Sequence, residues 1–170
     1  LSFFDPGKEK AAVVIKHNNP CGIALGLTTE KALKRAIEAD PESAFGGVMV
    51  LNDKIDMKLA KVIENFKEDK KSNVDILAAP KIDADALEFL SKIRKTMGIY
   101  TFGEIKNQKS KIKNIDIKFI DEGFIVQTYD DVSSRFDNWK VVTDKKPTKK
   151  QIEQMKLAWK FISRIKSNAV

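Results

Sequence analysis

Residues 11–22 read AAVVIKHNNPCG, in which a run of apolar side chains ends at a polar turn. A continuous apolar run is typical of a strand buried on both faces of a sheet. We therefore predict a strand over residues 11–15 and a turn through Pro20 and Gly22. Lys16 and His17 lie where the predicted strand meets the turn, and His17 is the only histidine of the chain.

Downstream of this stretch, apolar runs alternate with amphipathic segments. Helices are predicted to begin near Thr29, Asp56 and Asp83 or Asp85. Further strands are predicted over residues 47–51, 74–79 and 97–102. Strands separated by helices favour an α/β fold with a mostly parallel sheet and helices on both of its faces.

The second half of the chain has another pattern. Residues 113–120 and 124–129 flank a turn at Glu122–Gly123 and predict an antiparallel hairpin, and residues 139–143 predict a short strand. A capping box, Thr148 with Gln151, begins the last helix. Its predicted buried stripe consists of Ile152, Met155, Trp159, Ile162 and Ile165, and we expect Trp159 to be a core residue rather than a ligand platform.

Length and composition favour a single globular domain over residues 1–170, because 42% of the 170 residues are apolar. No apolar run approaches the roughly 20 residues of a membrane helix, and no export signal is recognisable. One cysteine cannot form an internal disulfide, which favours a cytoplasmic protein. Because the chain begins with Leu1 rather than methionine, we expect it to be a piece of a longer protein.

The net charge of +7 comes from 31 basic and 24 acidic side chains. Much of the excess lies in residues 92–118 and 140–150. An anion- or nucleic-acid-binding face is one interpretation. A solvated lysine-rich surface is favoured, because the lysines are dispersed and few aromatic residues lie among them.

Several classes of chemistry are disfavoured by what the chain contains. One histidine and one cysteine cannot supply the three or four ligands of a zinc site, so we expect no zinc. Cys21 lies near His17 but lacks a recognisable third partner, and we interpret it as a packing residue. The chain has neither a P-loop nor a dinucleotide-binding glycine triplet.

Two remaining segments are candidates for a site. Lys16 and His17 can supply a charged donor and a base, although isolated residues of these types are more often structural. The loop over residues 43–47 (SAFGG) can bring a flat ligand close to its backbone, or it can be an ordinary turn. Since ligands bind at the carboxyl ends of strands in open α/β sheets, we expect both segments and Asp75 to border one crevice.

Six segments resemble, in order, the motifs of one family, that of the bifunctional purine biosynthesis protein. In this family an aminoimidazole carboxamide ribonucleotide formyltransferase is joined to an IMP cyclohydrolase. The segments are IKHNNPCGIALG (15–26), DPESAFGGVMVLN (40–52), VDILAAP (74–80), EGFIVQTYD (122–130), VVTDKKPTKKQ (141–151) and AWKFISRIKSNAV (158–170).

The resemblance implies that the chain is the first of two similar halves of the formyltransferase region, with the cyclohydrolase domain absent. The implied fold is three-layer α/β/α and cytidine-deaminase-like. The implied reaction transfers a formyl group from 10-formyltetrahydrofolate, the co-substrate, to the 5-amino group of aminoimidazole carboxamide ribonucleotide. The parent is expected to be a homodimer, and this chain alone is expected to be inactive.

The resemblance also implies residue roles. His17 takes the amine proton, Lys16 stabilises charge at the formyl oxygen or passes a proton to the folate, and Asn168 orients the formyl group or the histidine. Substrate contacts are implied for Asn19, Ser43, Phe45 and Gly46, and a folate contact for Asp75. Three positions depart from the family pattern: Asn18 replaces a small residue, Glu122 replaces a glycine, and Ile99–Tyr100 stands where the family commonly has a leucine-rich strand.

One alternative function remains open at this point. A non-catalytic module with a basic surface could bind nucleotides or nucleic acid. Such a module would bind less tightly as salt increases and would be insensitive to loss of His17, whereas an enzyme would depend on it.

Overall fold

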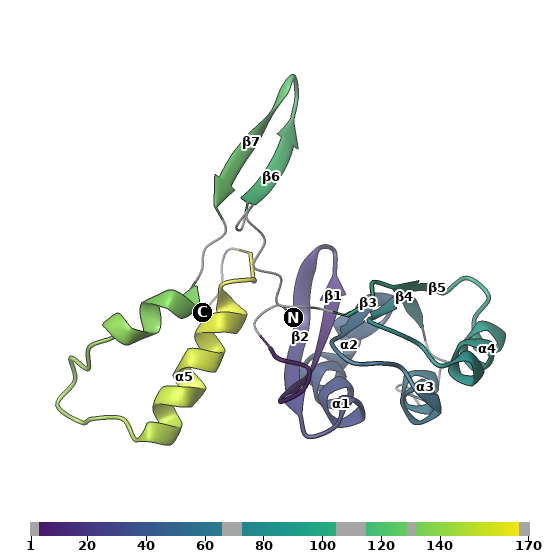
Figure 1. The fold of residues 1–170 in the computed structure, drawn as a ribbon, viewed down its shortest axis with the longest axis horizontal. Coiled ribbons are helices and arrows are strands. Elements are labelled where there is room, and N and C mark those ends of the chain that lie inside the picture. Colours follow the sequence, from purple (N-terminus) through teal and green to yellow (C-terminus); the bar gives the residue numbers. More distant parts are fainter. Residues whose placement is uncertain (1–3, 66–72, 105–114, 129–131, 167–170) are drawn as a thin grey trace. The chain divides into compact units, whose positions relative to one another are not determined.

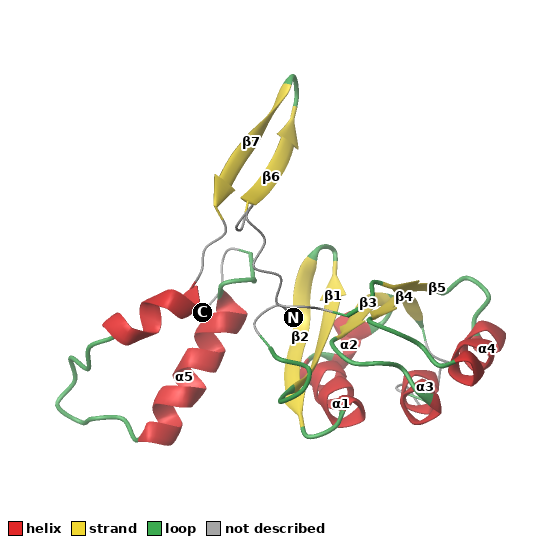
Figure 2. Cartoon of the chain, viewed as in Figure 1, coloured by secondary structure: helices red, strands yellow, loops and turns green. Residues whose placement is uncertain are grey.

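The structure, a computed structural model, describes residues 4–65, 73–104, 115–128 and 132–166 (Figure 1). The chain divides into two compact units, Leu1–Ile105 and Lys106–Val170. Helices and strands of both units are coloured by type in Figure 2. None of the helices within these described ranges is long and apolar enough to cross a membrane.

The first unit contains a five-stranded mixed sheet in the order β2-β1-β3-β4-β5. Its strands are β1 (Lys10–Lys16), β2 (Asn19–Gly26), β3 (Gly47–Leu51), β4 (Val74–Ala79) and β5 (Gly98–Thr101). Strand β1 pairs antiparallel with both β2 and β3, whereas β3, β4 and β5 are mutually parallel. Four strands therefore run in one direction and β1 runs in the other, so the sheet is mostly parallel, as predicted.

The helices of this unit begin at capping residues that the sequence largely identifies. They are α1 (Thr29–Ala39), α2 (Pro41–Ala44), α3 (Met57–Glu64) and α4 (Ala84–Ile93). Asp56 caps α3 and Asp83 precedes α4, as predicted. The cap of α1 is Thr28 rather than Thr29, because the Thr28 side chain accepts the hydrogen bond from the Lys31 N–H.

Strand β2 was not predicted, because Pro20 and Gly22 were interpreted as a turn. Both residues lie within β2, which is an edge strand of the sheet. A proline is tolerated at an edge or a bulge, and the register shifts where Pro20 pairs with Ile15. The turn lies instead at His17 and Asn18, whose φ angles of 52° and 66° suit a two-residue type I′ hairpin.

The core of the first unit lies between the sheet and a single layer formed by α1, α3 and α4. Contacts of α3 with both α1 and α4 place these helices side by side on one face of the sheet (Figure 2). Met49 and Leu77 on this face are fully buried, whereas Val13 and Ile15 of β1 are only partly buried. The prediction that residues 11–15 are buried on both faces is therefore wrong within this unit. A helical layer on the second face of the sheet stays a prediction.

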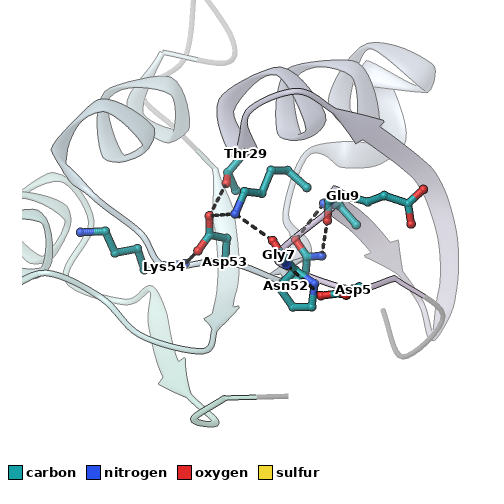
Figure 3. A network of polar contacts seen from close by, with 10 residues as sticks. Asp5, Gly7, Glu9, Thr29, Asn52, Asp53 and Lys54 are labelled. Carbon is teal, nitrogen blue, oxygen red and sulfur yellow. Dashed lines mark hydrogen bonds and ion pairs between the residues drawn. The ribbon is translucent and has the colours of Figure 1, made fainter. Parts of the chain in front are cut away.

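A polar network ties the N-terminal segment to the end of β3 (Figure 3). The side chain of Asn52, 1% exposed, accepts from the Ala11 N–H and donates to the Glu9 carbonyl, each at 2.8 Å. Next to it, Nζ of Lys10 lies 2.7 Å from Oδ2 of Asp53. The buried side-chain amide of Asn52 therefore has both of its polar groups paired, and it continues the contact between β1 and β3 past the end of β3.

The second unit contains a two-stranded hairpin, a 3₁₀ helix and a long helix. These are β6 (Ile115–Ile120) with β7 (Gly123–Thr128), η1 (Val132–Asn138) and α5 (Lys149–Ile162). The antiparallel hairpin was predicted, and its turn holds Glu122 at a φ of 64°. Glycine adopts this left-handed conformation readily, which explains why the family pattern has a glycine at the position that Glu122 occupies here.

Two predictions for the second unit are wrong. Residues 139–143 form no strand and do not pair with β6 or β7. Helix α5 has the predicted capping box, but none of its residues is buried. Trp159 is 50% exposed and packs edge-on against Trp139 at a ring-centroid distance of 5.8 Å, so it is not a core residue here.

Candidate functional site

The β1–β2 hairpin presents Lys16 and His17 next to each other. Lys16 is the last residue of β1 and pairs with Asn19, the first residue of β2. His17 lies in the two-residue turn between them and is exposed to solvent. The left-handed φ of His17 is uncommon outside glycine, although asparagine and histidine adopt it more often than most residues. The hairpin thus holds an imidazole at its tip, directly after a lysine.

The Lys16 ammonium is held by the loop that precedes β3. Its Nζ donates to the carbonyl of Phe45 at 2.7 Å and to the carbonyl of Gly46 at 3.0 Å. An ammonium has three N–H donors, and these are its two hydrogen bonds to described residues. The third N–H of Lys16 has no hydrogen-bond partner among the described residues, and the two carbonyls fix the position of the nitrogen.

Gly46 lies where the side chains of Lys16 and Asp75 come close to the loop before β3. Its φ is +67°, and a Cβ built on it would lie 2.9 Å from Nζ of Lys16 and 3.7 Å from Oδ2 of Asp75. Its N–H donates to the carbonyl of Asn73 at 2.6 Å. The absence of a side chain at this position lets Lys16 and Asp75 approach the same point. The structure thus brings together Lys16, Phe45, Gly46 and Asp75, which we call the Lys16 cluster.

The location of this cluster differs from the expected one. The prediction placed it at the carboxyl ends of parallel strands. Because β1 runs antiparallel to β3, its carboxyl end meets the amino ends of β3 and β4. Gly47 begins β3 and Asp75 is the second residue of β4. The predicted neighbours do meet, but at the amino ends of β3 and β4 rather than at their carboxyl ends, which the prediction had assumed.

Ser43 contributes to the shape of the loop that holds Lys16. It lies in α2, and its N–H donates to Oδ1 of Asp40, the capping residue of that helix, at 3.1 Å. Hydrogen bonds from the side chain and backbone of Ser43 lower the pKa of Asp40. Ser43 thus helps to cap the short helix that leads into Phe45 and Gly46.

Two other predicted residues have less to do with this cluster. Asn168 lies outside the described residues. Cys21 packs against the core, and its Sγ donates to the carbonyl of Val14 at 3.5 Å. Burial, followed by the nearby charge of Asp40, raises the pKa of its thiol. A thiol with a raised pKa is a poor nucleophile, in agreement with the interpretation of Cys21 as a packing residue.

Sequence reasoning missed Arg94, which binds Asp75. Nη2 of Arg94 lies 2.7 Å from Oδ1 of Asp75. Arg94 caps the carboxyl end of α4, just before β5, and β5 is the parallel neighbour of β4. Because β4 and β5 are parallel neighbours, their first residues lie side by side. Knowing that these two strands pair would therefore have been enough to predict the contact between Asp75 and Arg94. The sequence alone does not show which strands are neighbours.

No group of three His, Cys, Asp or Glu side chains within the described ranges is placed to hold a metal ion. The second unit has a hollow of ≈ 780 Å³ between α5 and the loop that precedes it. None of the predicted site residues that the structure describes lines this hollow. The chemistry available at the Lys16 cluster is thus that of a fixed cation, an exposed imidazole and a carboxylate.

Comparisons with known proteins find one family. Residues 2–170 match the family described as AICARFT/IMPCHase bienzyme. The chain is 37% identical over 162 residues to the bifunctional purine biosynthesis protein PurH of Persephonella marina, covering 95% of this chain and 29% of that protein. It is 38% identical to PurH of a Thermoanaerobacter species, covering 96% of this chain and 30% of that protein. The chain thus spans less than a third of the length of these relatives.

The comparison with solved structures gives a weaker match to a dCMP deaminase from the cyanophage S-TIM5, with a TM-score of 0.43 and 12% sequence identity. The match covers 55% of this chain and 79% of the deaminase chain.

Proposed function

Because the chain belongs to the AICARFT/IMPCHase bienzyme family of purine biosynthesis, we propose that it is the first part of the formyltransferase region of its parent enzyme. The proposed reaction transfers a formyl group from 10-formyltetrahydrofolate to the 5-amino group of aminoimidazole carboxamide ribonucleotide. The proposed parent is a cytoplasmic homodimer. The three-layer, cytidine-deaminase-like fold belongs to the same proposal.

The reaction sets two chemical requirements. The acceptor amine is a weak nucleophile, because its lone pair delocalises into the imidazole ring and the carboxamide. Attack on the formyl carbon needs removal of a proton from the nitrogen. It also produces a negatively charged tetrahedral oxygen that needs a hydrogen-bond donor in a fixed position.

The observation that carries the proposal is the position of Lys16. Two backbone carbonyls hold its ammonium at 2.7 and 3.0 Å, next to an exposed histidine. A cation positioned before the reaction needs little reorganisation when charge develops on the formyl oxygen. We assign this role to the remaining N–H of Lys16, and the role of base to the imidazole of His17.

The other predicted residues complete the proposed site. Phe45 and Gly46 line the pocket of the base or the folate, and Asp75 accepts a hydrogen bond from the folate. Contacts to the nucleotide are assigned to Asn19 and Ser43. Asn168 orients the formyl group or the histidine. Since the relatives are more than three times longer, the activity belongs to the parent enzyme, and this chain alone is expected to be inactive.

The test measures tetrahydrofolate release by the parent enzyme, with and without the acceptor nucleotide. His17→Asn is the informative variant, because asparagine accepts the left-handed turn conformation but cannot act as a base. We expect this variant to lose activity on the order of a hundredfold or more. Asn18→Gly, the neighbouring turn position, is the control and should retain activity.

Two results would contradict the proposal. The absence of nucleotide-dependent release by the folded wild-type parent would exclude formyl transfer and favour the alternative of a binding module. Full activity of His17→Asn would leave the reaction in place but remove the histidine from it.

A further inference from the structure

We propose that Asn73 is a further ligand-binding residue beside the Lys16 cluster, and that its side-chain amide binds an uncharged group of the acceptor nucleotide. The proposal rests on the proposed function, since this nucleotide is the acceptor of that reaction. Asn73 directly precedes β4, and it was not among the residues predicted for the site. The charged groups of the cluster are the Lys16 ammonium and the Asp75 carboxylate, so the amide adds a neutral donor and acceptor.

The backbone fixes Asn73 beside the loop that holds Lys16. The carbonyl of Asn73 accepts a hydrogen bond from the Gly46 N–H at 2.6 Å. The residues that follow these two, Val74 and Gly47, begin the parallel pairing of β4 with β3. Asn73 is thus held through its main chain, and a substitution of its side chain leaves this contact in place.

The Asn73 side chain converges with Lys16 on one side of Gly46. Its Nδ2 lies 3.6 Å from the point that a Cβ on Gly46 would occupy, and Nζ of Lys16 lies 2.9 Å from the same point. Two carbonyls of the loop already hold this ammonium. A ligand that contacts the third N–H of Lys16 therefore comes close to the Asn73 amide.

The Asn73 amide has no structural task among the residues that the structure describes. It is half-buried and makes no side-chain hydrogen bond to them. The amide of Asn52, in contrast, is buried and bonded through both its oxygen and its nitrogen. An amide that stabilised the fold would use at least one of its two N–H donors or its carbonyl acceptor. The Asn73 amide is therefore available to a ligand.

The chemistry of the acceptor nucleotide suits a neutral donor and acceptor at this place. Its reacting 5-amino group must reach His17, the proposed base, which directly follows Lys16. The ring carbon that bears this amine lies between the carbon that bears the carboxamide and the nitrogen that bears the ribose. A carboxamide and a ribose hydroxyl each offer a donor and an acceptor, as the Asn73 amide does. An uncharged group of this kind thus lies on either side of the amine.

The experiment measures, in the parent enzyme, the affinity for the acceptor nucleotide by calorimetric titration without folate, together with the steady-state kinetic constants. We expect Asn73→Ala to raise the dissociation constant and the KM for the nucleotide about fivefold, as for one uncharged hydrogen bond, with a smaller change in kcat. Thermal unfolding should be unchanged. Asn65→Ala is the matched control and should keep the wild-type affinity, because its amide bonds to the Lys61 carbonyl of α3 at 3.1 Å.

Two analogues show which group the amide binds, one without the carboxamide and one with a 2′,3′-dideoxyribose. The wild type and Asn73→Ala should bind one of these analogues equally well, because the group that the amide recognises is missing from it. A difference that persists with both analogues would overturn the proposal. An unchanged affinity of Asn73→Ala for the complete nucleotide would overturn it as well, as would a loss of folate affinity in place of nucleotide affinity.

The outcomes separate this proposal from the proposed function. A parent that binds the nucleotide with this dependence on Asn73 but transfers no formyl group would refute the proposed function and leave the role of Asn73 intact. Formyl transfer with an unchanged nucleotide affinity in Asn73→Ala would do the reverse. A folded parent that binds no nucleotide would overturn both.

Discussion

Gly46 shows at the scale of one residue how a backbone position serves a site. Its φ is +67°, and Nζ of Lys16 lies only 2.9 Å from the point that a Cβ on this residue would occupy. Two consecutive glycines before a strand left two interpretations open, a close approach of a flat ligand to the backbone or an ordinary turn. The side chain that approaches comes from a strand 30 residues earlier, which the sequence analysis had expected to border the same crevice as this loop.

Gly46→Ala is expected to lower the proposed activity strongly without unfolding the protein. The added Cβ would displace Nζ of Lys16, the far end of a flexible side chain, so the steric cost is small. The left-handed backbone adds roughly 1 kcal/mol of strain. We expect the proposed formyl transfer by the parent enzyme to fall on the order of a hundredfold, as when one fixed donor is lost.

Gly103→Ala is the matched control for this variant. Gly103 has a φ of +74°, but a Cβ there would meet nothing within 4 Å. Both variants should therefore lose similar stability in thermal unfolding, and only Gly46→Ala should lose activity. Equal activity of the two variants would show that the position of Lys16 is unimportant.

At the scale of elements, the packing of α1 on β2 explains why the edge strand contains Gly22. A Cβ on Gly22 would lie 1.9 Å from the carbonyl oxygen of Ala36, in the middle of α1. Helix and strand are in direct backbone contact at this point. The strand therefore carries a glycine for packing, although the same residue in the sequence indicated a turn.

Gly22→Ala is expected to destabilise the first unit by about 3 kcal/mol. The clash is with backbone, so no side chain can rotate to relieve it and α1 must move away from β2. Chemical denaturation measures the loss, with Gly123→Ala as the control because a Cβ there meets nothing within 4 Å. A variant as stable as the wild type would show that α1 does not pack this closely on β2.

At the scale of the whole molecule, Asp53 in the polar network of the N-terminal segment makes the stability of the folded state depend on pH. Burial raises the pKa of Asp53, but hydrogen bonds from Lys10, from the Lys54 N–H and from Thr29 together lower it below its ordinary value of 3.8. A carboxylate with a lowered pKa stabilises the folded state above the unfolded-state pKa. That contribution is lost as the pH falls below about 3.8 through the folded-state pKa.

Asp53→Asn should therefore lower the free energy of unfolding at neutral pH, by up to about 1 kcal/mol for a partly exposed pair. The same variant should lose less stability than the wild type between pH 4 and pH 2, a window set roughly by the lowered carboxyl pKa. Urea unfolding at a series of pH values measures both effects. Glu38→Gln, which removes an exposed pair with Lys34, should change stability at neutral pH by less than about 0.5 kcal/mol. Parallel curves for Asp53→Asn and wild type would contradict the prediction.

Local patterns in the sequence determined most of the individual elements. The strand over residues 74–79 has the predicted bounds, and Asp56, Asp83 and the capping box at Thr148 lie where helices begin. Apolar spacing and capping act between residues a few positions apart, so they are visible in the sequence. The family followed from six short motifs, and the comparisons confirm it.

The tertiary structure decided how these elements are combined. It turned β1 antiparallel to its neighbours, placed Lys16 at the amino ends of β3 and β4, and brought Arg94 to Asp75. It also left Trp159 half exposed on a helix whose apolar stripe predicted a buried face. Strand direction, side-chain contact and burial depend on partners far away in the chain, and local propensities carry no information about which partner is chosen.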